Sequence, residues 1–265
     1  MTTAHSTDGQ GPSDTPDRGT GGQGSPGWTA AVRHRLSLGR LLPSGGPSEG
    51  IWVTEQAATA ELRRAAVAVP GASLGRLWLS PADRDGPGLP VVPPPPGAAA
   101  AVPLRIDGEF TATTGEPLMV VAQRLREVLA GAAEERLGLD VVEVDLRITG
   151  LVEPAAGPGA ESVRKSAPTG PVGVRAVAER GEAARAAAGV PGVAYLTGTL
   201  GAAVTVTWDQ VRVEVATSPG HHAPTVARAV REAVSTTGPS PVTVLVTAVG
   251  VTRETARADH GPAES

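Results

Sequence analysis

The chain has 265 residues, a net charge of −4 and no cysteine, which excludes a disulfide framework and cysteine-based zinc sites. The acidic balance argues against broad nucleic-acid binding, which needs a basic face for the phosphates. Aromatic residues make up only 2% of the chain, and its 34 Gly and 25 Pro limit the length that can be ordered. We therefore expect one or two small domains with cores of small aliphatic side chains.

The N-terminal residues 1–26 are rich in Thr, Ser, Asp, Gly and Pro, a composition that predicts a disordered arm. They lack the basic start and apolar stretch of a secretion signal. No apolar run in the sequence approaches the ~20 residues that span a bilayer. These features predict a cytoplasmic protein without a transmembrane segment.

Residues 27–50 predict a short amphipathic helix followed by a connector. From 28 to 38, apolar residues recur at every fourth position and basic residues lie elsewhere around the helix. Such a helix can complete the core of the chain, or lie on an acidic membrane surface or in the groove of a partner. The candidate partner-docking residues are Trp28, Val32 and Leu36 on the apolar face, with Arg33 and Arg35 beside it. The Gly-rich run at 42–47 lacks the Gly-Lys-Ser/Thr of a phosphate-binding loop, so we expect a connector there.

A first α+β unit is expected over 51–152. Thr54 is a plausible N-cap for a helix that ends at Val69-Pro70-Gly71, because the residue before proline disfavours the helical region. A strand follows at 74–79, with Leu77 and Leu79 on one side and Trp78 on the other. The Pro-rich stretch 81–103 is read as an insertion at a hairpin tip, either a surface connector or a segment that docks in an aromatic groove. The remaining elements are a second strand around 105–110, a helix at 117–137 and a strand at 141–151.

A Pro/Gly/Ala linker is expected over 153–171, a second unit over 172–251 and a disordered polar tail over 252–265. The second unit has the same order of elements, with Val190-Pro191-Gly192 after its first helix. In place of the Pro-rich insertion it has a tight hairpin at Trp208-Asp209-Gln210.

The order of segments in 66–151 is repeated in 187–251, with matching punctuation and a Glu at the equivalent place in each middle strand, Glu109 and Glu214. Such self-similarity indicates an internal repeat. The predicted fold is therefore α+β, with two tandem α-β-β-α-β units that pack as a pseudo-symmetric pair. We expect each unit to place its helices on one face of a three-stranded sheet.

Residues that could carry chemistry are sparse. His221 and His222 are sequence neighbours whose rings point in different directions, so we expect a solvated helix N-terminus rather than a metal site. Glu109 and Glu214 could act as paired carboxylates, but the alternation in their strands predicts that both lie on exposed faces. The sequence therefore predicts no enzyme and no catalytic, cofactor-binding or metal-binding residues.

Four segments of the second unit resemble the alkaline-shock or envelope-stress-response family of small α+β proteins: 188–193, 211–216, 226–234 and 242–249. The whole chain, including Leu38 to Pro43 and the Pro-rich insertion, looks like an actinobacterial family that carries a label taken from nucleopolyhedrovirus proteins. The resemblance implies a non-enzymatic cytoplasmic protein. Family members associate with the cell envelope through membrane-anchored partners, and some self-assemble. This chain departs from the family pattern because it has two units where one is usual.

Two hypotheses of function follow. The first is a structural or interaction protein that a protein partner, membrane-anchored in the family, recruits to the inner face of the membrane. The alternative is a module that binds a small ligand or nucleic acid in an arginine-lined groove between the two units. Its basic residues would be Arg105, Arg124, Arg126, Arg212, Arg228 and Arg231.

Overall fold

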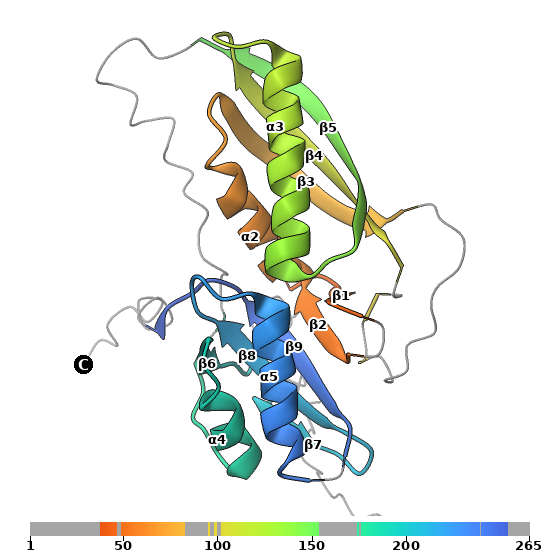
Figure 1. Ribbon diagram of the computed structural model, residues 1–265, viewed down its shortest axis with the longest axis vertical. Coiled ribbons are helices and arrows are strands. Elements are labelled where there is room, and N and C mark those ends of the chain that lie inside the picture. Colours follow the sequence, from red (N-terminus) through yellow and green to blue (C-terminus); the bar gives the residue numbers. More distant parts are fainter. Residues whose placement is uncertain are drawn as a thin grey trace, which may run out of the picture.

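The computed structural model describes residues 38–46, 49–82, 95, 98–99, 102–153, 174, 176–238 and 240–253. Within these residues the chain forms four α-helices and two β-sheets, a mixed α+β architecture (Figure 1). The predicted arm at 1–26, nearly all of the linker at 153–171 and nearly all of the tail at 252–265 lie outside the described residues.

The first sheet has three strands and follows the predicted element order. Strands β3 and β4 pair antiparallel, and β4 and β5 pair parallel. Helices α2 and α3 pack on one face of this sheet (Figure 1). A five-residue π-helical turn, Ala132–Arg136, extends α3. The elements are α2 (Glu55–Ala66), β3 (Ala72–Pro81), β4 (Leu104–Thr113), α3 (Leu118–Gly131) and β5 (Val141–Val152).

The start of α2 is where the sequence predicts it. The Thr54 hydroxyl accepts a hydrogen bond from the Ala57 N–H at 3.2 Å, which satisfies one of the free donors of the first turn. The helix ends at Ala66, three residues earlier than predicted, because the chain tightens into i→i+3 hydrogen bonds before the Val-Pro-Gly turn. Gly71 in that turn and Gly192 in the matching one both have positive φ, 74° and 92°, which glycine adopts without steric cost.

The second sheet has the same strand pairing as the first and also contains additional strands. β6 pairs antiparallel with β8, and β8 pairs parallel with β9. The sequence predicts one strand before the Trp208 hairpin, but a partly buried loop over 197–203 divides it into β6 and β7, and both pair with β8. The elements are α4 (Glu182–Ala188), β6 (Val193–Leu196), β7 (Val204–Val206), β8 (Val211–Thr217), α5 (Ala223–Ser235) and β9 (Val242–Ala248).

Two further strands reach the second sheet from the N-terminal side of the chain. β1 (Leu41–Pro43) pairs antiparallel with β2 (Ile51–Thr54), and β2 pairs parallel with β9. This differs from the prediction of a connector at 42–47 and from the expectation of a three-stranded second sheet. The physical reason is that β9 is buried along its whole length, and β2 supplies hydrogen-bond partners for an edge that would otherwise be open. The sheet order is β1-β2-β9-β8-β6, with β7 beside β8.

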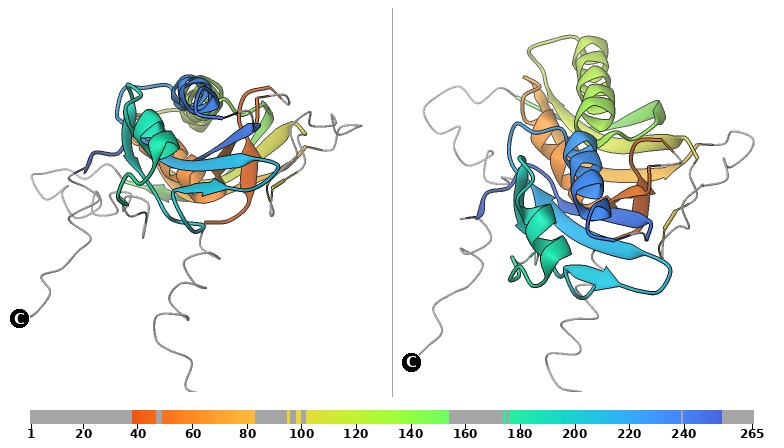
Figure 2. Two further views of the ribbon diagram at one scale, coloured as in Figure 1. Left: turned by 90° about the horizontal axis from the view of Figure 1, so that it is seen from below. Right: turned by 60° about the horizontal axis from the view of Figure 1, so that its bottom comes forward.

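One continuous hydrophobic core runs through both sheets. Helix α2 lies at the junction and contacts β3 and α3 on one side and β2 and β9 on the other. Helices α3 and α5 follow one another along the long axis, on the same side of the two sheets (Figures 1 and 2). The core includes Leu42, Val53, Leu62, Phe110, Leu129, Val215, Val230 and Val246.

An ionic cluster centred on Glu61 joins the two halves. The Glu61 side chain, which is only 4% exposed, accepts hydrogen bonds from Arg64 and, at 2.9 Å, from Arg136 beyond α3. Arg64 also donates to the Val249 carbonyl at the end of β9, with both distances 3.2 Å. The buried carboxylate therefore orders two arginines, one of which bonds to the second sheet.

Replacing Glu61→Gln should lower the free energy of unfolding by about 1–3 kcal/mol, because two arginines lose their charged acceptor while their partly exposed tips can be rehydrated. Urea denaturation followed by tryptophan fluorescence measures the change. Glu127→Gln, at an exposed position of α3, is the matched control and should stay within about 0.5 kcal/mol of the wild type. Equal effects of both substitutions would contradict the role of Glu61.

The face of the second sheet that points away from α5 is also buried. Tyr195 is 4% exposed there and packs with Ala216, Ala248 and Val251. Burial raises the pKa of the Tyr195 phenol above its ordinary value, because the charged phenolate is disfavoured in an apolar environment.

The chain has one tyrosine, so the change in ultraviolet absorbance when a phenol ionises reports Tyr195 alone. In the folded protein the titration midpoint should lie above the ~10 of an exposed tyrosine, and in denaturant it should return to that value. Because the folded pKa is the higher one, this contribution to stability is present below pH ~10 and is lost as the pH rises through the folded pKa. Tyr195→Phe should remove that alkaline loss of stability. A folded midpoint at or below the ordinary value would contradict the burial of the phenol.

Candidate functional site

The face of the three-stranded sheet that α2 and α3 leave uncovered is the candidate site. Side chains alternate across each strand, so the residues between the buried positions of β3, β4 and β5 point away from the helices. Trp78 on β3 is 46% exposed there, between the buried Leu77 and Leu79. The outward-facing charged residues are Arg105, Asp107 and Glu109 on β4, with Glu143, Asp145 and Arg147 on β5.

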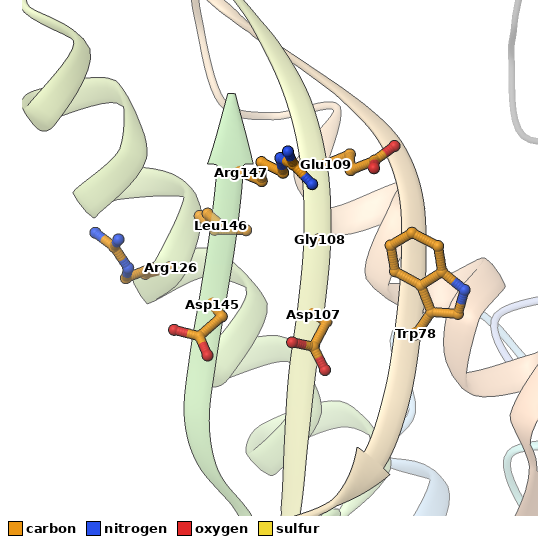
Figure 3. Close-up of a pocket in the computed structure, with 8 residues that line it drawn as sticks. All are labelled: Trp78, Asp107, Gly108, Glu109, Arg126, Asp145, Leu146 and Arg147. Carbon is orange, nitrogen blue, oxygen red and sulfur yellow. The ribbon is translucent and has the colours of Figure 1, made fainter. Parts of the chain in front are cut away.

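A shallow hollow of about 330 Å³ lies on this face. Cross-strand register aligns Trp78, Asp107 and Asp145 in one row and places Glu109 beside Arg147 in the next. Figure 3 shows Trp78 at one end of the hollow, the two aspartates beside each other, and Arg147 and Glu109 above them. The lining residues are Trp78, Asp107, Gly108, Glu109, Arg126, Asp145, Leu146 and Arg147.

The charges around the hollow are only partly paired. Arg105 forms salt bridges with Asp107 at 3.3 Å and Glu143 at 3.8 Å. The Asp107 carboxylate, its closest partner, is the main cause of a raised pKa of Arg105. Asp145 and Arg147 form no salt bridge within the described part of the chain. Asp107 and Asp145 are like charges opposite each other, an arrangement that costs free energy in the isolated protein and favours a cation.

The chemistry of this surface suits recognition. A half-exposed indole beside two carboxylates can hold the basic side chain of a partner through cation–π and ionic contacts. The paired carboxylates considered from the sequence do not meet, because Glu109 lies on the open face of β4 in the three-stranded sheet and Glu214 is buried on β8 in the other sheet.

The expectation that both repeat-equivalent glutamates are exposed is wrong for Glu214. Glu109 is partly exposed on the open sheet face, but Glu214 is fully buried. The Glu214 carboxylate accepts hydrogen bonds from the Thr199 N–H at 2.8 Å and the Leu200 N–H at 3.0 Å, and Arg212 lies 3.7 Å away. The loop 197–203, which divides β6 from β7, covers Glu214, and its backbone N–H groups need an acceptor on the sheet. The alternation of apolar and polar residues along the strand does not reveal such a loop.

The two histidines occupy the helix N-terminus that the sequence predicts. His222 is the N-cap of α5, where its Nδ1 accepts from the Thr225 N–H at 3.3 Å. The His221 ring lies beside the Pro219 carbonyl, 3.2 Å from Nδ1. In the described ranges no three His, Cys, Asp or Glu side chains gather closely enough to hold a metal ion.

The six arginines of the alternative groove are spread over the two halves. Arg124 pairs with Glu116 at 3.0 Å, and Arg126 donates to the Val144 carbonyl at 3.3 Å. Arg212 lies beside Glu214, and Arg105 pairs on the open sheet face as described. Arg228 and Arg231 share a partner, because both contact Glu49, through its carboxylate at 2.9 Å and its carbonyl respectively.

The predicted docking residues Trp28, Val32, Leu36, Arg33 and Arg35 lie outside the described residues. Sequence patterns alone do not predict Trp78, Asp107, Asp145 and Arg147 as a site. One signal was available: Trp78 alternates with Leu77 and Leu79, which places a large indole on the solvent side of a strand. The rows that join these residues across β3, β4 and β5 depend on strand register, which a single sequence does not define.

No protein-family model matches the chain, and no curated protein sequence is significantly similar to it. None of the helices in the described ranges has the length and apolar character needed to cross a membrane.

Removing the buried carboxylate with Glu214→Ala should lower the free energy of unfolding by about 2–4 kcal/mol, because two backbone N–H groups lose their acceptor. Glu214→Gln retains an acceptor and should cost less. Glu109→Ala, at the equivalent place in the other sheet, is the control and should change stability by no more than about 0.5 kcal/mol. Chemical denaturation measures all three, and equal losses at Glu109 and Glu214 would contradict the assigned environments.

Proposed function

We propose that this chain is a non-enzymatic interaction protein whose docking surface is the open face of the three-stranded sheet. The observation that carries the proposal is the row formed by Trp78, Asp107 and Asp145 at the solvent surface beside a hollow. A large indole left 46% exposed in the middle of a strand is the kind of residue that anchors protein interfaces. The adjoining carboxylates favour a basic segment of the partner.

We infer further that the two halves are diverged copies packed as a pseudo-symmetric pair. In both halves a helix precedes an antiparallel strand pair, and a second helix connects the middle strand to a parallel third strand. The positive φ of Gly71 and Gly192 at matching turns supports this. In the second copy the corresponding sheet face is buried, so the two copies differ in the surface that they offer to a partner.

The resemblance of the second half to envelope-stress-response proteins supplies the cellular part of the proposal. Members of that family reach the envelope through membrane-anchored partners. By the same route, a partner that binds the open sheet face would recruit this chain to the cytoplasmic face of the membrane.

The test compares three full-length proteins, wild type, Trp78→Ala and Trp208→Ala, as baits in affinity capture from membrane and cytosolic fractions of the native cell. Loss of the anchor in Trp78→Ala should weaken binding of the partner about thirtyfold and reduce its recovery accordingly, since an interface hot spot contributes ~2 kcal/mol or more. The partner should be recovered from the membrane fraction and identified by quantitative mass spectrometry.

Trp208 is the matched control because it is 94% exposed but lies at the hairpin of the other sheet, so its variant should recover as much partner as the wild type. Circular dichroism confirms that both variants are folded. Undiminished recovery with Trp78→Ala would overturn the docking surface, and a partner found only in the cytosolic fraction would overturn recruitment to the membrane.

A further inference from the structure

Strand β5 has a hydrogen-bonded neighbour on one side only. It runs over twelve residues, pairs with β4, and has no strand on its other side in the part of the chain that the structure describes. Many of its side chains are exposed, among them Val142, Ile148 and Leu151. A long edge strand with free N–H and C=O groups is a template for pairing with another strand.

The opposite edge of the same sheet is blocked. On β3 the Gly75 carbonyl accepts a hydrogen bond from Arg63 at 2.6 Å, and the Leu79 carbonyl accepts one from Arg40. The strand also has a bulge between Leu74 and Leu77 and ends at Pro81, features that prevent strand addition. The bulge and the proline distinguish the two edges, because the β5 edge also has a side-chain contact, from Arg126 to the Val144 carbonyl at 3.3 Å, but has neither a bulge nor a proline between Glu143 and Ile148. The Val144 carbonyl can accept a second hydrogen bond.

The residues of β5 suit a second copy of themselves. The register with β4 shifts at Val142 and at Thr149, so Glu143 to Ile148 forms the regular stretch between two bulges. In this stretch Val144, Leu146 and Ile148 share the helix side, and the charged residues share the open face. Two β5 strands related by a two-fold axis perpendicular to the sheet pair antiparallel, and such an axis keeps each face in register with itself.

Charge selects one register. When the axis passes through Leu146, each Asp145 lies opposite Arg147 of the second copy, and Val144 lies opposite Ile148. When the axis passes through Arg147, two arginines lie directly opposite each other. When it passes through Asp145, two aspartates do so, although Glu143 then lies opposite Arg147. Each of these registers contains a direct like-charge pair, which is unfavourable, and the register centred on Leu146 contains none. In their own chain Asp145 lies within the field of Arg105, and Glu109 lies opposite Arg147 on β4, but among the described residues neither side chain is within salt-bridge distance of an opposite charge. Pairing therefore gives each of them a direct ionic partner.

We propose that β5 is the interface of a two-fold symmetric dimer, in which two three-stranded sheets join into one continuous sheet centred on Leu146. The partner is a second copy of this chain. The open faces that contain Trp78 then lie on the same side of the joined sheet and form one extended surface. This inference does not depend on the proposed docking partner.

Analytical ultracentrifugation of the purified full-length protein over a range of concentrations tests the dimer. The wild type should shift from 26.6 kDa toward twice that mass as concentration rises. Arg147→Asp places aspartates opposite each other and should weaken dimerisation about tenfold or more, and Asp145→Arg should do the same by opposing two arginines.

Mixing the two single variants provides the decisive comparison. A copy with Arg at both 145 and 147 pairs favourably with a copy that has Asp at both, so the mixture should dimerise although neither variant does so alone. Arg76→Asp, an exposed position on the blocked edge strand β3, changes the net charge equally and should dimerise like the wild type. A wild type that stays monomeric at every concentration, or single variants whose mixture does not dimerise, would overturn the proposal.

Discussion

The junction at Thr54 is the constraint on which the arrangement of this protein depends. Thr54 is the last residue of β2 in the second sheet, and its side chain caps the helix that packs on the first sheet. With no residue between strand and helix, the position of β2 beside β9 determines where α2 begins. Because α2 contacts both sheets, the two halves share one core and cannot separate without exposing it. The Glu61 cluster adds a polar connection at the other end of α2.

The same junction explains why the two halves present different surfaces. β1 and β2 extend the second sheet. Its strand β8 is largely buried on both faces and holds Glu214 inside, bonded to two backbone N–H groups. Within the described residues the first sheet has no additional strand, one of its faces and the edge of β5 are open, and Glu109 lies at the surface. Equivalent residues in the two halves therefore have different roles: one stabilises a buried loop, and the other belongs to a polar surface.

The open surfaces support an interaction role more directly than a catalytic one. The groups that could serve acid–base chemistry are distributed over β4, β8 and α5, whereas an exposed indole, Asp107, Asp145 and Arg147 gather on the open face of one sheet. Docking uses the sheet face around Trp78 and pairing uses the backbone of the β5 edge, and the Asp145 side chain contributes to both. A dimer through β5 would double the docking surface without covering Trp78, which gives the two proposals a common geometry and separate tests.

The sequence alone determined the local elements: the cap at Thr54, the Val-Pro-Gly turns with positive-φ glycines, the strand that exposes Trp78 and the helix N-terminus at His222. Each depends on residues within a few positions of one another, where propensity and periodicity act. Only the tertiary structure decided that β1 and β2 join the sheet of the distant β9, that Glu214 is buried, and that Trp78, Asp107 and Asp145 form one row. These features depend on strand register and on contacts between residues far apart in the chain. The alternation of side chains along a strand is the same whether its second face is covered or open, so the sequence alone does not distinguish the two cases.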